Sequence, residues 1–135
     1  QRQMCIRDRL QMDSDFHFVP MNDVLFDLQR KIILDAAEKE DCVIVGRCAN
    51  HILDNKCLSV FIHAPFEYRV QTVIERTGRE EKSAQKLVKK VDKERRTYYE
   101  YFTDKKWKDI SQYHLAFDSS KFEQDKIIQM IKMAL

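Results

Sequence analysis

Glycine and long apolar runs are both scarce in this sequence of 135 residues. It contains two glycines, Gly46 and Gly78, and neither belongs to a GxxxxGK[ST] motif. The backbone amides of that motif cradle phosphate groups, so these residues include no phosphate-binding loop of that kind. No apolar run approaches about 18 residues, and the first residues form no apolar stretch typical of a signal peptide. Both absences argue against a membrane span or export and favour a cytoplasmic location.

The four cysteines lack the spacing of a metal or redox site. Cys5, Cys42, Cys48 and Cys57 form no CxxC pair, and we predict no metal site among them. Two of them lie in or beside apolar segments, so buried thiols are favoured over disulfides or bound zinc.

The net charge of +2 conceals a concentration of basic residues in one segment. Residues 76–108 hold twelve basic and six acidic side chains, whereas the rest of the chain sums to −4. This asymmetry predicts a partner that carries phosphate. A solvated helix with internal ion pairs would have the same composition, so composition alone does not decide between the two.

Three short apolar runs predict the strands of a sheet. They are CVIVG (42–46), LSVFIHA (58–64) and HLAFD (114–118). Wholly apolar runs are typical of strands covered on both faces, and helical patterns separate these three. The sequence therefore predicts an α/β fold with a parallel sheet and crossover helices. Residues 1–13 match nothing in this organisation, and we interpret them as a tail or junction outside the fold.

Four helices are expected around these strands. The first begins after an N-cap at Asn22 and ends near Lys39. Its predicted buried stripe is Leu25, Leu28, Ile32 and Ala36. The second opens at Pro65, ends near Gly78 and has an inner face made of Phe66, Val70 and Val73. A long third helix follows, and the fourth opens with a capping box over residues 120–123. Its predicted buried residues are Ile127, Ile131 and Leu135.

The long helix carries an arginine on its buried stripe. The apolar positions of that stripe are Ala84, Leu87, Val88, Val91, Tyr98 and Phe102. Steps of three and four residues place Arg95 on the same line, where an unpaired guanidinium would be costly. Asp92, three residues earlier, can hold this guanidinium and leave donors for an external anion. The alternative is a purely internal salt bridge. Arg96 lies about 100° further round the helix and is the weaker candidate.

The carboxyl ends of the predicted strands supply further candidates, because ligands of open parallel sheets bind beyond them. After the first run, Gly46 permits a turn that brings Arg47 to this rim. The third run ends in Asp118-Ser119-Ser120, which either borders a ligand or only caps the last helix.

Five segments occur in a characteristic order. They are CVIVGRCANHIL, LSVFIHAPFEYRV, DKERRTYY, the following KKW, and YHLAFDSS. Together they resemble the cytidylate kinase-like family of P-loop nucleoside monophosphate kinases, from about Ser14 to the C-terminus. The resemblance implies a three-layer α/β/α P-loop fold and transfer of phosphate from ATP, with Mg²⁺, to an acceptor such as CMP. It divides the chain into residues 1–13 and a partial kinase domain over 14–135, with a lid over about 76–108.

The resemblance also implies roles for particular residues. Arg47, preceded by Gly46, matches the arginine that contacts the phosphate of the acceptor. In related enzymes an aspartate commonly follows that arginine, whereas this chain has Cys48. Asp92 and Arg95 match the lid pair spaced by three, whose arginine grips the transferring or acceptor phosphate.

Further matches lie around the lid and after the third run. Arg76 resembles a lid arginine that contacts nucleotide, and Arg96 is a second candidate for substrate contact. Ser119 and Ser120 match the segment next to the ATP base, so they are the cofactor-binding candidates. Phosphoryl transfer depends mainly on positioning and charge neutralisation, which makes arginines that close over the phosphates its principal protein tools.

The absent GxxxxGK[ST] motif limits what these residues can do alone. In the family, a further strand lies between those that correspond to 42–46 and 58–64. We therefore expect an incomplete, marginally stable and catalytically inactive chain that associates through unpaired strand edges. Two other interpretations stay open. One is a noncatalytic nucleic-acid-binding module that uses the basic helix and its tyrosines, and the other is a regulatory pseudoenzyme.

Overall fold

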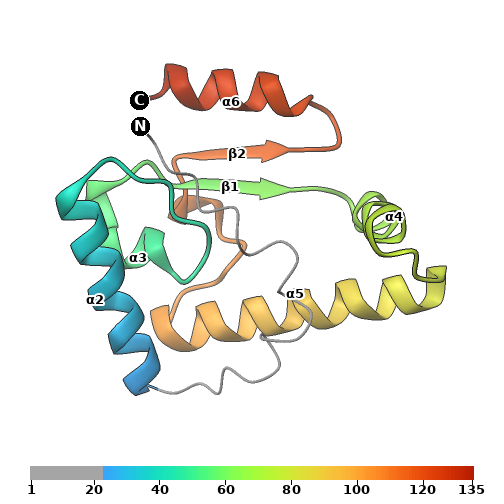
Figure 1. The fold of residues 1–135 in the computed structure, drawn as a ribbon, viewed down its shortest axis with the longest axis horizontal. Coiled ribbons are helices and arrows are strands. Elements are labelled where there is room, and N and C mark those ends of the chain that lie inside the picture. The colour runs from blue at the N-terminus through green and yellow to red at the C-terminus, as the bar shows by residue number, and fades with distance from the viewer. Residues whose placement is uncertain (1–22) are drawn as a thin grey trace. The chain divides into compact units, whose positions relative to one another are not determined.

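The computed structural model describes residues 23–135, whose course is shown in Figure 1. The predicted tail over residues 1–13 and the predicted N-cap at Asn22 lie outside the described residues. The chain divides into two compact units. One comprises the residues up to Cys57 together with Thr97–Trp107, and the other comprises Leu58–Arg96 together with Lys108–Leu135.

The first unit is helical in its described part. It contains α2 (Asp23–Lys39), α3 (Ala49–Leu53), the 3-10 turn η2 (Asp54–Lys56) and the last residues of α5 (Glu81–Thr103). The predicted helix over 22–39 is thus confirmed as α2. Its predicted buried stripe is wrong, because Leu28 is 52% exposed and Ile32 68% exposed while Ile33 is buried. The face of α2 that carries Ile33 and Leu34 packs against α3. The sequence pattern of α2 alone does not specify which face contacts another helix.

A second apolar cluster in this unit gathers aromatic side chains. Its members are Cys48, Tyr98 and Tyr99, with Phe26, Phe102 and Trp107 packed against them. The rings of Phe26 and Phe102 stack with centroids 4.2 Å apart and an interplanar angle of 9°. Stacked and edge-on aromatic pairs add to the stabilisation that burial gives. Tyr98 and Tyr99 are therefore packing residues, whereas Tyr101 is 52% exposed.

The apolar run over residues 42–46 is not the predicted buried strand. In the described chain it contains only an isolated bridge at Val43. Val43 is 45% exposed and Val45 60% exposed. A strand is stable only where a neighbour pairs with its backbone, and within residues 23–135 no strand forms a ladder with this run. Apolar composition alone therefore gave the wrong assignment.

The second unit contains a small parallel sheet. Its elements are β1 (Val60–His63), α4 (Phe66–Thr77), the first part of α5, η3 (Ile110–Gln112), β2 (Leu115–Asp118) and α6 (Gln124–Met133). The two strands lie side by side in Figure 1, with Val60 opposite Leu115 and His63 opposite Asp118. The prediction of a parallel α/β arrangement is confirmed for these two strands.

Helices α4 and α5 form the core of the second unit. Val70, Ala84 and Val88 are buried, with Phe66, Val73 and Ile74 packed against them. This confirms the inner face predicted for α4. Gly78 has a φ of 70° at the C-cap, and its N–H donates to the carbonyl of Ile74. A glycine tolerates this left-handed conformation without a steric penalty, which explains why α4 ends there.

The start of α6 differs from the predicted capping box. Glu123 occupies the N-cap position and its side chain makes no capping hydrogen bond. The hydroxyl of Ser120 instead donates to Asp118. Ile127 is buried as predicted, but Leu135 is 69% exposed because the helix ends at Met133. Within residues 23–135, none of the helices combines the length and the apolar character that crossing a membrane requires.

Candidate functional site

The loop after β2 folds back onto the carboxyl end of β1. The backbone N–H of Ser119 donates to the carbonyl of His63 at 2.9 Å, and its hydroxyl donates to the same oxygen at 3.2 Å. The N–H and hydroxyl of Ser120 donate to Oδ1 of Asp118 at 2.9 and 2.6 Å. These hydrogen bonds from Ser120 lower the pKa of Asp118. The predicted candidates Ser119 and Ser120 therefore order this rim of the sheet.

Arg69 connects the end of β1 to the long helix. Its Nε donates to the carbonyl of Ala64 at 2.9 Å, immediately after the strand. Its Nη1 donates to both carboxylate oxygens of Asp92, at 2.8 and 2.7 Å. The two side chains are 31% and 26% exposed, so this ion pair is partly shielded from water. A charge-assisted contact of this kind fixes position more firmly than a pair on an open surface.

Arg95 lies one turn after Asp92 on α5. Its pKa is affected by the charges of both Asp92 and Arg69. Burial lowers the pKa of Arg95, the carboxylate of Asp92 opposes that shift, and Arg69 adds to it. The predicted proximity of Asp92 and Arg95 is thus present in the structure. The carboxylate also binds Arg69, which the sequence analysis did not identify. One negative and two positive side chains form the cluster, which we call the Arg69–Asp92–Arg95 cluster.

An aromatic ring near this cluster lies beside two cationic side chains. The guanidinium of Arg69 lies 5.9 Å from the ring centroid of Phe66, and Nζ of Lys89 lies 5.6 Å from the same centroid. An aromatic face stabilises a nearby cation. Phe66 therefore helps to keep two cations beside the start of α4.

In the first unit, the predicted Gly46-Arg47 turn has an unusual backbone. The φ angles of Gly46, Arg47 and Cys48 are 74°, 57° and 59°, so three consecutive residues are left-handed. A Cβ on Gly46 would meet no atom within 4 Å, so the conformation rather than crowding requires glycine there. Left-handed residues other than glycine are costly and persist only where their surroundings hold them.

The side chains of this turn face the aromatic cluster. Cys48 is buried with Tyr98 and Tyr99, and burial raises its pKa to about 12 although Arg47 opposes the shift. Burial raises the pKa of Tyr98, and the nearby guanidinium of Arg47 opposes that rise. The hydroxyl of Tyr98 donates to Oε1 of Gln29 at 2.7 Å. Cys48 and Tyr98, rather than Arg47, are therefore the residues that the apolar cluster of this unit holds.

The remaining predicted contacts, Arg76 and Arg96, are exposed side chains. Arg76 lies in the last turn of α4, and Arg96 follows Arg95 on α5. Both belong to the second unit, as does the Arg69–Asp92–Arg95 cluster, whereas Gly46 and Arg47 belong to the first. Arg69 was missed because its partner Asp92 is 23 residues away. Its position four residues after Pro65, in the first turns of the helix that follows β1, was the available signal.

The described residues do not match the donor set of a bound metal. Among residues 23–135, no group of three or more His, Cys, Asp or Glu side chains could hold a metal ion. The sequence also lacks the GxxxxGK[ST] loop for triphosphate. Guanidinium groups such as those of Arg69 and Arg95 are suited to binding anions, because they donate several hydrogen bonds in a planar fork.

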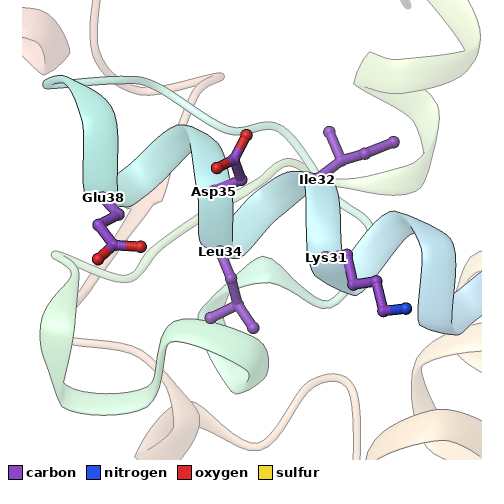
Figure 2. A pocket seen from close by; sticks show the side chains of 5 residues that line it. All are labelled: Lys31, Ile32, Leu34, Asp35 and Glu38. Carbon is purple, nitrogen blue, oxygen red and sulfur yellow. The ribbon is translucent and has the colours of Figure 1, made fainter.

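A depression on α2 does not coincide with these candidates. Figure 2 shows its lining, which consists of Lys31, Ile32, Leu34, Asp35 and Glu38. All five residues come from one helix, and the lining mixes two apolar side chains with charges of both signs. None of the predicted site residues contributes to it.

Comparisons with known proteins relate the chain to cytidylate kinases. It is 26% identical over 111 residues to the cytidylate kinase of Methanopyrus kandleri, 30% over 104 residues to that of Pyrococcus furiosus, and 30% over 117 residues to that of Methanococcoides burtonii. These alignments cover 75%, 76% and 86% of this chain but 58%, 53% and 65% of the relatives. The chain thus spans between about half and two thirds of their length.

A solved structure and a family match extend this relationship. The crystal structure of an uncharacterized protein from Eubacterium ventriosum is similar with a TM-score of 0.70 and 33% identity, over 87% of this chain and 70% of that one. Residues 3–121 match the cytidylate kinase-like family. The match covers most of the sequence and agrees with the order of motifs, so the chain belongs to the cytidylate kinase-like family.

Proposed function

We propose that this chain forms the acceptor-side part of a nucleoside monophosphate kinase that transfers phosphate from ATP to CMP. The observation that carries the proposal is the Arg69–Asp92–Arg95 cluster, where Arg69 pairs with the carboxylate of Asp92 and Arg95 lies within electrostatic reach of both. Arginine binds phosphate groups through its planar fork of donors, so two arginines held at this place favour binding of an anion. The relatives named cytidylate kinase support CMP as the acceptor.

Within this proposal, Arg95 contacts the acceptor or transferring phosphate. Asp92 is a positioning residue that accepts the hydrogen bonds of Arg69 and lies within electrostatic reach of Arg95. Because Arg69 is anchored on the carbonyl of Ala64, the cluster is tied to the end of β1, where ligands of parallel sheets bind. An arginine that stabilises the transition state of phosphoryl transfer contributes about 10³ to 10⁵ in rate.

The other predicted residues have supporting roles. Gly46 and Arg47 form the turn that reads the phosphate of the acceptor, and Arg76 and Arg96 are additional contacts of the lid with nucleotide. Ser119 and Ser120 border the ATP base through the loop that their hydrogen bonds order.

The donor is ATP with Mg²⁺ in a three-layer P-loop fold, to which this chain contributes the acceptor side. Because its sequence lacks GxxxxGK[ST], we propose that the 135-residue chain alone transfers no phosphate. The test is incubation of the purified chain with CMP, ATP and MgCl₂, followed by chromatography of the nucleotides. Formation of CDP above a protein-free control would contradict the proposal. A cytoplasmic location and association through strand edges stay predictions.

The nucleic-acid-binding alternative is supported less well. Stacking on bases requires exposed aromatic faces, whereas Tyr98 and Tyr99 are buried and only Tyr101 of these three is exposed. Calorimetric titration of the chain with CMP and, separately, with a single-stranded oligonucleotide discriminates between the functions. The kinase proposal expects saturable binding of CMP. Tight oligonucleotide binding that weakens steeply between about 50 and 200 mM salt, without CMP binding, would favour the alternative.

A further inference from the structure

The ring of Phe66 is held in place by the core of the second unit. Phe66 is the first residue of α4 and packs against the buried side chains that join α4 to α5. Side chains packed in this way stay close to one rotamer, so the neighbours of the ring fix its position. Phe66 also follows closely after Ala64, whose carbonyl binds Arg69 at the end of β1. A fixed aromatic ring therefore lies beside this rim of the sheet.

Two cations from different helices lie against this ring. Cζ of Arg69, in α4, is 5.9 Å from the ring centroid of Phe66, and Nζ of Lys89, in α5, is 5.6 Å from the same centroid. An aromatic face attracts a cation, and this attraction offsets part of the repulsion between two like charges. Phe66 thus brings the ammonium of Lys89 close to the Arg69–Asp92–Arg95 cluster.

The charges of these two cations are balanced differently. Arg69 forms an ion pair with Asp92, which accepts from it with both carboxylate oxygens. Lys89 lies three residues before Asp92 on α5, a spacing that permits contact on a helix. Nevertheless, no carboxylate among residues 23–135 forms an ion pair with Lys89. The neutral ring stabilises this ammonium without neutralising it, so Lys89 keeps its positive charge for an incoming anion.

The ammonium of Lys89 is also accessible to a ligand. Lys89 is exposed, whereas Phe66 is half-buried. A lysine presents three donors at the end of a flexible stem, and a lysine in open solvent would sample many positions. Contact with a fixed ring favours one of them, which reduces the ordering that binding would otherwise require.

We propose that Lys89 is a further binding residue for the phosphate of the nucleoside monophosphate, and that Phe66 is the positioning residue that holds its ammonium beside the cluster. This inference rests on the proposed function, in which Arg95 contacts that phosphate. A phosphate monoester carries about −1.5 to −2 charge near neutral pH, so a further cation adds to the attraction that arginine provides. Phe66 itself contacts no phosphate, and its effect on binding passes through the cations on its ring.

Calorimetric titration of CMP compares Lys89 with a matched lysine. Lys89→Ala should weaken CMP binding by about fivefold, because one charged contact with the phosphate is lost. Lys93→Ala removes an exposed charge one turn further along α5 and should change the affinity by less than about twofold. Lys89→Arg retains both the charge and the attraction to the ring, so its affinity should stay within about twofold of that of the unmodified chain. The loss in Lys89→Ala should shrink between about 50 and 500 mM NaCl, since salt screens an exposed charge.

A second measurement requires no nucleotide. The ring current of an aromatic side chain displaces the NMR chemical shifts of nearby protons, so the ε-methylene signal of Lys89 should differ from that of Lys93. Phe66→Leu keeps an apolar side chain and removes the ring, and it should move the Lys89 signal to the value of Lys93. The signal is assigned by its disappearance in Lys89→Arg. Thermal unfolding of each variant establishes that the compared proteins are folded.

A double-mutant cycle connects the ring to binding. Phe66→Leu should weaken CMP binding by about twofold in the unmodified chain and by less in the Lys89→Ala background, because part of its effect passes through Lys89. Equal effects in the two backgrounds, or a Lys89 signal that does not respond to Phe66→Leu, would overturn the positioning role of Phe66.

The outcomes separate this inference from the function on which it rests. If the unmodified chain binds no CMP, or if Arg95→Ala binds it equally tightly, the proposed function is wrong and the inference falls with it. If Arg95→Ala weakens CMP binding while Lys89→Ala behaves like Lys93→Ala, only the inference is overturned.

Discussion

Arg69 donates from one nitrogen to both carboxylate oxygens of Asp92, at 2.8 and 2.7 Å. The two residues are 23 positions apart and come from different helices, α4 and α5. Their ion pair therefore fixes the part of α5 that carries Arg95 relative to the end of β1. The arginine identified from the sequence acts beside a second arginine that the sequence pattern did not reveal.

Removing Arg69 should destabilise the second unit. Arg69→Ala leaves the carboxylate of Asp92 partly buried without this partner and should lower the free energy of unfolding by about 1.5 kcal/mol. Urea denaturation measures the change. The matched control is Lys39→Ala, because Lys39 pairs with Asp35 on the surface at 70% and 62% exposure. An exposed pair should contribute less than about 0.5 kcal/mol. Equal losses in the two variants would contradict the structural role of Arg69.

Alanine substitutions at the two glycines should distinguish an effect on stability, caused by backbone conformation, from an effect on CMP affinity. Gly46 and Gly78 both have positive φ, and a Cβ at either position would meet no atom within 4 Å. Alanine should therefore cost about 1 kcal/mol of stability at each, from conformation alone. Only Gly46→Ala should also weaken CMP binding, since Gly46 belongs to the turn of Arg47. The comparison pairs urea denaturation with calorimetric titration, and an equal effect of both variants on CMP affinity would contradict this assignment.

Cys48 should make stability sensitive to alkaline pH. Burial raises the pKa of Cys48 to about 12, whereas a thiol in the unfolded chain ionises near about pH 8.5. Between about pH 8.5 and about pH 12 the unfolded state loses a proton that the folded state keeps. The contribution is therefore full well below about pH 8.5 and falls as the pH rises above that value, by at most about 1.4 kcal/mol per pH unit.

The measurement is the slope of unfolding free energy against pH between about 8.5 and 10. Cys48→Ala should reduce that slope, whatever its effect on absolute stability. Cys42→Ala, which changes an exposed thiol, is the control. Unchanged slopes in both variants would show that Cys48 ionises equally easily in the folded and unfolded chain.

The sequence pattern predicted some strands of this fold but not which apolar runs would pair. Apolar runs predicted β1 and β2 correctly, and the helical patterns between them indicated that the two strands are parallel. The run over residues 42–46 has the same composition and forms no strand within the described chain. Composition measures how well a segment suits burial, but a strand also needs a neighbouring backbone to pair with.

The helices and the site show a similar limit. Helix α2 has apolar residues on more than one side, so its period identified a helix without determining that Ile33 faces the core. Arg95 could be singled out because a charge interrupts a local apolar stripe. Arg69 could not, because its importance comes from a contact with Asp92 that only the folded chain creates. Local charge patterns are readable from sequence, whereas partners distant in sequence are not.

The most direct test of the anion-binding cluster is calorimetric titration of CMP into the chain and its Arg95→Ala variant. A lost charge-assisted contact should weaken CMP binding by at least about tenfold, with a smaller effect on unfolding free energy. Lys93→Ala removes an exposed positive charge from the same helix and should change the affinity less than about twofold. Equal losses in the two variants, or no loss in Arg95→Ala, would contradict the proposal that this cluster binds the nucleotide phosphate.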